Sequence, residues 1–164
     1  MYYAKNHVST NANENMMTPP EDMGNPPDKT DGDNNASTKL EENNTITNND
    51  KTGNFLRIQK DSWGNSGSNG GDVTLTLKNQ TVTGNIVVDS ISTLDMSLTS
   101  ASYFEGAINT DNTAKKITLK LDKTSKIKLT ADTYVTILDD ADKTYANIDL
   151  NGYKLYINNV EINK

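Results

Sequence analysis

The sequence predicts an all-β fold, a small parallel β-solenoid that follows a first third without stable structure. Three observations support this prediction. Short apolar runs of period two fill the chain from Phe55 onward, the runs recur at a spacing near 22 residues, and the first third is rich in Asn, Asp and Pro. Period-two runs bounded by turn residues indicate short strands, and a repeat of this length indicates stacked coils.

The first third differs from the rest in charge and in apolar content. Its first 50 residues contain three Lys and nine Asp or Glu, so they carry the whole formal net charge of −6. Residues 11–53 hold all four Pro and few apolar side chains, too few to offset the entropy of ordering the backbone. We therefore predict a disordered acidic linker or loop over residues 11–53.

Residues 54–164 form the predicted solenoid with its C-terminal cap. The apolar runs alternate with Thr, Ser, Asp or Lys, and no window shows a helical stripe. The last run contains Asn151–Gly152, a pair typical of tight turns. In order, the predicted strands are residues 73–77, 94–98, 117–121, 127–129 and the two arms of 148–157.

Two segments of this region can be laid over each other, which is the main argument for a solenoid. The segment beginning at Thr83 aligns with the segment beginning at Glu105. In this alignment Gly84 falls on Gly106, Ile86 on Ile108, and Leu94, Met96 and Leu98 on Ile117, Leu119 and Leu121. Stacking would place each aliphatic side chain over its equivalent in the next coil. The alternative is an antiparallel β-sandwich of hairpins, which does not explain the repeated Gly and Ile spacing.

Composition excludes several classes of function. Residues 51–164 hold 13 basic and 13 acidic side chains, so they lack the basic excess that nucleic-acid binding requires. There is no Cys, which excludes disulfides and thiolate chemistry. No apolar run approaches the length of about 20 residues that a membrane span needs, so we expect no membrane insertion. The N-terminus has no signal-peptide pattern.

The Gly-rich stretch from Lys60 to Val73 holds the only Trp. It lacks the Lys of a phosphate-binding loop and precedes a strand, which excludes a nucleotide loop. One interpretation is a polar corner between coils. The other is a sugar platform, in which the ring of Trp63 stacks on a pyranose while Asp61 and Asn65 bind hydroxyls. Tyr103 is a further candidate for carbohydrate binding.

No catalytic set stands out in the predicted solenoid. The single His7 lies beside the linker, and without Cys there is no nucleophile–base pair in the folded part. Glu105 is the carboxylate that a glycosidase reading would use first, although a solvated outer face explains it as well. We therefore expect a protein that is not an enzyme.

Two further clusters lie near the C-terminus. Asp139, Asp140 and Asp142 resemble a calcium loop in their spacing, but they lack the Gly and the distal Glu of an EF-hand. A solvated turn is the alternative, and no other cofactor is expected. The four late Tyr residues either close the end of the solenoid or form an exposed strip for glycan. They are Tyr134, Tyr145, Tyr153 and Tyr156.

The repeats over residues 54–158 resemble the C-terminal portion of large surface proteins of clostridia-like bacteria, a family described as carbohydrate-binding domain-containing proteins. The resemblance is carried by "NFLRIQKDSWGNSGSNGGDVTLTL", "GAINTDNTAKKITLKLDKTSKIKLTADTYVT" and "YANIDLNGYKLYIN". It implies a right-handed parallel β-helix in a larger exported protein at the cell surface. Residues 1–10 would then be the last strand of an upstream coil, and this chain a fragment.

The predicted function is a non-catalytic extracellular module that binds carbohydrate or an adhesin-type surface ligand. Two alternatives remain. The chain could be a fragment of a polysaccharide lyase or glycoside hydrolase whose catalytic coils lie upstream, or a structural stalk.

Overall fold

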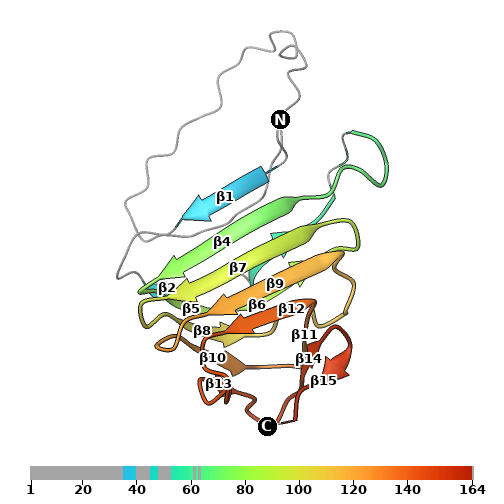
Figure 1. The fold of residues 1–164 in the computed structure, drawn as a ribbon. Helices are drawn as coiled ribbons and strands as arrows, with labels where there is room; N and C mark the ends of the chain where they lie inside the picture. The colour runs from blue at the N-terminus through green and yellow to red at the C-terminus, as the bar shows by residue number, and fades with distance from the viewer. Residues whose placement is uncertain (1–34, 40–44, 48–52, 61, 63, 164) are drawn as a thin grey trace.

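The computed structural model describes residues 35–39, 45–47, 53–60, 62 and 64–163, and it confirms the all-β prediction. Parallel strands stack into a β-solenoid of about four turns, which run in chain order from β1 to β15 (Figure 1). None of the described residues belongs to a helix that could span a membrane. The right-handed sense of the helix stays a prediction.

Two five-stranded sheets form the body of the solenoid, and we name them A and B. Sheet A consists of β1 (Asn35–Lys39), β4 (Asp72–Lys78), β7 (Thr93–Thr99), β9 (Lys116–Leu121) and β12 (Ile137–Asp140). Sheet B consists of β2 (Thr45–Thr47), β5 (Thr81–Thr83), β8 (Tyr103–Gly106), β10 (Lys126–Leu129) and β13 (Ile148–Asp149).

Two smaller sheets close the third side. Sheet C pairs β3 (Asn54–Ile58) with β6 (Asn85–Val88), and an isolated parallel bridge joins Ile86 to Ile108. Sheet D contains β11 (Thr133–Val135), β14 (Leu155–Ile157) and β15 (Val160–Glu161). All described pairings are parallel except β14 with β15. Each turn of chain therefore visits sheet A, then sheet B, then the third side.

The predicted stacking register is confirmed residue by residue. Leu94 pairs with Ile117, Met96 with Leu119 and Leu98 with Leu121, all in parallel strands. This pairing excludes the antiparallel sandwich. The approach of Gly106 to the previous coil confirms the alignment of the two Gly, because a Cβ added at Gly106 would lie 2.2 Å from the carbonyl oxygen of Gly84. Successive coils therefore touch backbone to backbone at this corner.

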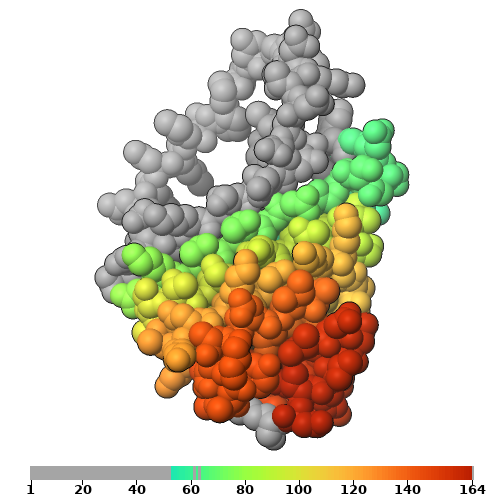
Figure 2. Space-filling view, viewed as in Figure 1, coloured from blue at the N-terminus to red at the C-terminus, as the bar shows by residue number. Residues whose placement is uncertain are grey.

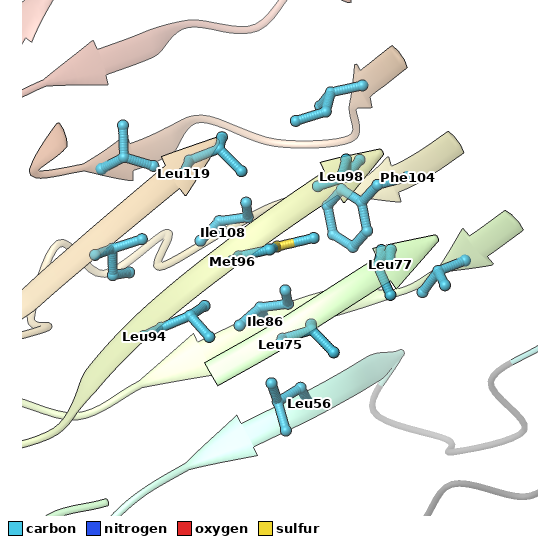
Figure 3. Close-up of a cluster of buried hydrophobic side chains, with 14 of the residues drawn as sticks. Leu56, Leu75, Leu77, Ile86, Leu94, Met96, Leu98, Phe104, Ile108 and Leu119 are labelled. Carbon is cyan, nitrogen blue, oxygen red and sulfur yellow. The ribbon is translucent and has the colours of Figure 1, made fainter. Parts of the chain in front are cut away.

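The core is the narrow space between the sheets, and it is filled by inward-pointing aliphatic columns (Figure 3). Strand β7 shows the origin of this arrangement, since its buried residues alternate with half-exposed ones over its whole length. Leu77, Leu98 and Leu121 form one column, in which each side chain lies over its equivalent in the next coil. Each buried side chain of this kind contributes roughly 1.5–3 kcal/mol. Figure 2 shows the coils as successive layers of colour.

The corner between sheets A and B is held by a buried polar ladder. The backbone N–H of Gln80 donates to Ser102 Oγ at 3.1 Å, and the N–H of Ser102 donates to Ser125 Oγ at 3.2 Å. In the last coil, Asn147 Nδ2 donates to the carbonyl oxygen of Ser125 at 3.2 Å. These bonds satisfy backbone groups that the sheets cannot reach at the corner.

Strands β1 and β2 lie inside the range for which a disordered linker was predicted. They pair in parallel with β4 and β5, so the prediction does not hold for residues 35–39 and 45–47. The reason is that an uncovered edge strand offers a row of unpaired N–H and C=O groups. An extended segment can form hydrogen bonds with this row regardless of its own side chains. The remainder of 11–53, apart from Gly53, and the upstream strand predicted at residues 1–10 lie outside the described residues.

The C-terminal end departs from the simple repeat. Asn151 and Gly152 make a turn with positive φ, as predicted, but this turn joins sheet B to sheet D and does not form a hairpin. The hairpin follows at Asn158–Asn159, where both residues have positive φ and β15 folds back on β14. Ile157 then pairs with Val160 in antiparallel register. This reversal ends the parallel stacking in sheet D.

Candidate functional site

The outer face of sheet B holds the aromatic candidate that the structure describes in full. We name it the Tyr103 face. It is made by the outward residues of three neighbouring strands, β5, β8 and β10, and they are Thr81, Thr83, Tyr103, Glu105, Lys126 and Lys128. These strands are parallel and in register, so their outward side chains stand in rows across the face. Tyr103 lies between Thr81 and Lys126 in one row, and Glu105 lies between Thr83 and Lys128 in the next.

Tyr103 contacts a residue of its own strand. Its hydroxyl donates to Glu105 Oε2 at 3.3 Å, although the two residues are separated by two positions on β8. Residues i and i+2 of a strand are on the same face and almost 7 Å apart, so the two side chains must approach each other along β8 to make this contact. Tyr103 is half-buried, so part of its side chain stays accessible to solvent. Burial raises the pKa of Tyr103, and the charge of Glu105 raises it further.

Glu105 and Lys128 form an ion pair across two coils. Their side chains approach to 3.0 Å, and both remain about one-third exposed. The hydrogen bond to Glu105 raises the pKa of Lys128. Glu105 therefore anchors two neighbours, the hydroxyl of Tyr103 and the ammonium of Lys128. These two contacts fix the position of the Glu105 carboxylate on the face. Neither partner is a carboxylate, so they do not supply the second acidic group that a glycosidase needs.

The sugar platform predicted around Trp63 is described only in part. Trp63 and Asp61 lie outside the described residues, whereas Asn65 is exposed in a turn closed by the bond from Ser68 N to its carbonyl oxygen. Asn65 precedes the start of β4, whereas Tyr103 follows the end of β7. Because β4 and β7 are parallel and seven residues long, the two candidates lie near opposite ends of sheet A, roughly 20 Å apart. They do not form one site.

The Gly pair at the end of this stretch belongs to a corner between coils. A Cβ added at Gly70 would lie 2.3 Å from the carbonyl oxygen of Ile91, so only Gly allows the close approach. The next residue, Gly71, donates its N–H to Ser92 Oγ at 2.9 Å. For this part of the stretch, the corner interpretation is confirmed.

The three carboxylates of the predicted calcium loop are not brought together. Asp139 is exposed, and its carboxylate lies 3.8 Å from Lys143 Nζ. Asp142 accepts hydrogen bonds from Thr144 and from Ala146 N within its own turn. Asp140 points inward and is buried. Among the residues described, no group of three or more His, Cys, Asp or Glu side chains could hold a metal ion.

The late Tyr residues have different roles. Tyr134 and Tyr156 stack in neighbouring coils, with ring centroids 4.5 Å apart and an angle of 3° between the planes. Each ring covers one face of the other, and Glu161 of β15 lies opposite Tyr156. Tyr145 is partly buried against the core, and Tyr153 is exposed. The stacked pair extends the side of the solenoid down to its cap, so it is less suited than Tyr103 to stack on a sugar.

Sequence reasoning missed two features of these surfaces. The first is Lys128, whose partnership with Glu105 depends on a register between β8 and β10 that the sequence does not display. The second is the inward position of Asp140, which follows once β12 is aligned with β9.

Comparison of the chain with protein-family models, with curated proteins and with solved structures finds no match.

Proposed function

We propose that this chain is a non-catalytic, extracellular carbohydrate-binding module and that the Tyr103 face is its binding surface. The observation that supports this most directly is that the Tyr103 hydroxyl is anchored on Glu105 of the same strand, on an outward face of the sheet. Sugars stack their apolar C–H face on aromatic rings, and a ring already held in place loses little conformational entropy when it binds.

The surroundings of the ring suit a hydroxyl-rich ligand. Thr81 and Thr83 are exposed on one side, and Lys126 and Lys128 flank the other side, so donors and acceptors lie around the aromatic surface. The charges of Glu105 and Lys128 offset each other, and Asp149, which pairs with Lys128 in register on the next strand, balances the charge of Lys126. The ligand class that fits is therefore a neutral glycan.

The parallel sheet also supports a chain ligand over a single sugar. Strands in a sheet are spaced by about 4.7–4.9 Å, which is close to the length of one pyranose in an extended glycan. A glycan lying along the stacking axis would meet a new strand at nearly every sugar. Tyr103 would hold one sugar, and the outward residues of β5 and β10 would contact its neighbours.

The setting of the module is part of the same proposal. We place it at the cell surface, within a longer exported protein, because its repeats resemble those of bacterial surface proteins. An adhesin-type surface ligand is the broader form of the proposal, and the glycan is the specific form.

The proposal is tested by screening the full chain on a glycan array and measuring the hits by titration calorimetry. Tyr103→Ala should weaken binding by about 1–2 kcal/mol, or roughly 5- to 30-fold in Kd, because the stacking surface is lost. Tyr103→Phe should retain most of the affinity, since it keeps the ring. Tyr153→Ala is the matched control, because Tyr153 is exposed at 41% and lies in the connection between β13 and β14, outside the residues of the Tyr103 face.

Two outcomes would contradict the proposal. If no glycan binds at millimolar concentration, the structural-stalk alternative is favoured. If Tyr103→Ala and Tyr153→Ala bind a hit equally well, the Tyr103 face is not the binding surface.

A further inference from the structure

One position in the aliphatic core is occupied by a carboxylate. The column of Leu77, Leu98 and Leu121 continues in register to Asp140, which pairs with Leu121 at the end of β12. Asp140 is only 1% exposed. The neighbouring column keeps its apolar character, since Leu138 pairs with Leu119. The column of Leu94 and Ile117 also turns polar, because the backbone N–H of Ile117 donates to Thr136 Oγ1 in the last coil. Asp140 differs from Thr136 in carrying a carboxylate, and local violations of a packing rule tend to mark functional or strained sites.

Half of the hydrogen-bonding capacity of Asp140 is used. Its Oδ1 accepts from the N–H of Asp142 at 2.8 Å and from Asn147 Nδ2 at 3.1 Å. Its Oδ2 is buried, and no described residue donates a hydrogen bond to it. The same is true of Oδ1 of Asn147, a residue that is 8% exposed. Two contacting side chains thus each present a buried oxygen that the described residues leave without a donor.

A buried carboxylate without a positive partner is costly. Burial of an ionised group is tolerated when a cation or a full set of hydrogen bonds compensates it. The ammonium of Lys143 donates at 2.6 Å to the main-chain carbonyl oxygen of Asp140, and its ion pair is with Asp139. Asn147 Nδ2 also donates to the main-chain oxygens of Asp122 and Ser125, which fixes the amide with its nitrogen engaged and its Oδ1 without a donor.

We propose that Asp140 and Asn147 form a binding site for a hard metal cation of the calcium class inside the last coil. Calcium takes carboxylate oxygens, Asn side-chain oxygens, main-chain carbonyls and water as ligands, and the first two are the atoms left without donors here. Asp139 and Asp142 are not part of this set, because their carboxylates are engaged with Lys143 and with the 142–146 turn. With one formal negative charge, the site should bind weakly, with Kd on the order of 10⁻⁴–10⁻³ M.

The first experiment uses the unmodified chain. The protein is freed of metals with a chelator, and its thermal unfolding is followed while CaCl2 is added at constant ionic strength, with MgCl2 and NaCl in parallel. Calcium at about ten times Kd should raise Tm by a few degrees, and calorimetry should give one site per chain. If calcium, magnesium and sodium all leave Tm unchanged and no heat of binding appears, the proposal is wrong. A buried water that donates to both oxygens would then account for them.

Variants locate the site. Asp140→Leu continues the leucine column, so the variant should fold and should no longer respond to calcium. Asp139→Asn is the matched control, because it also removes one negative charge from β12 but at an exposed position, and it should respond like the unmodified chain. Lys143→Gln removes a nearby positive charge and should tighten calcium binding. An equal calcium response in Asp140→Leu and in the unmodified chain would place the cation elsewhere and overturn the assignment. None of these variants touches the Tyr103 face, so failure here leaves the glycan proposal standing.

Discussion

The inner coils and the last coil differ most clearly in the column that begins at Leu77. In the inner coils this column is aliphatic, whereas in the last coil it ends in Asp140. Sheet D shows the same change, because parallel stacking gives way there to the antiparallel pair β14–β15. Inward charge and irregular edges are known ways to stop a sheet from adding further strands. Each inner coil is therefore stabilised by an equivalent coil on either side. The last coil has no following coil and carries residues that depart from the repeat.

The largest contrast is expected for truncation of the core. Leu98→Ala should cost about 2–5 kcal/mol of unfolding free energy, because Leu98 is fully buried between coils. Ile137→Ala in the last coil should cost less than about 1 kcal/mol, since Ile137 is 43% exposed. Urea unfolding monitored by circular dichroism measures both. Equal losses would mean that the last coil is packed as tightly as the inner ones.

A second prediction concerns backbone contact between inner coils. Gly106→Ala should destabilise by about 3 kcal/mol, because the new methyl group would collide with the carbonyl of Gly84 and force the coils apart. Asn65→Ala, in an exposed turn, is the control and should change stability by less than about 0.5 kcal/mol. A Gly106→Ala variant as stable as the parent would show that the coils do not touch at this corner.

A third prediction compares two turn carboxylates across pH. Burial opposes ionisation of Asp122, but hydrogen bonds from Ser100 N, Ser125 and Thr124 outweigh it and lower its pKa to about 2. A lowered pKa adds stability above the unfolded value of 3.8, and this stability is lost as pH falls from about 4 to about 2. After allowance for solvent screening, the loss is on the order of 1 kcal/mol.

Asp142 is the counterpart in the last coil. Hydrogen bonds from Thr144 lower the pKa of Asp142, and the donors to its carboxylate belong to its own turn. Asp122, in contrast, accepts from Ser100 N of the previous coil. Asp122→Asn should therefore flatten the acid dependence of stability more than Asp142→Asn does. Urea midpoints at pH 5 and pH 2.5 test this. A larger effect from Asp142→Asn would contradict the comparison.

The smallest predicted effect is stabilising. Ala101 has φ near 61°, a left-handed conformation that costs an L-residue with a Cβ roughly 1–2 kcal/mol. Ala101→Gly removes this strain but increases the entropy of the unfolded chain, so a net gain of about 0.5 kcal/mol is expected. The Tm should rise by about 1–2 °C. Ala131→Gly, where no positive φ applies, should lower it instead.

Much of the fold follows from the sequence because a solenoid repeats one local pattern. Alternation in β7 and β9 identifies the inward residues, and the spacing between them sets the register, so Leu98 over Leu121 could be predicted without any long-range information. The last coil could not be predicted in the same way. The step from Leu121 to Asp140 is 19 residues, against 23 from Leu98 to Leu121, so this alignment is not visible until β12 is paired with β9.

The chain by itself determined the strands, the period and the aliphatic columns, because each of these depends on alternation along a few residues. The tertiary structure alone decided where polar side chains meet. Tyr103 reaches Glu105 along β8, Glu105 reaches Lys128 in the next coil, and Asp140 meets Asn147 inside the last coil. These contacts depend on side-chain conformation and on the pairing between coils. Neither can be predicted from the alternation of residues along a single strand.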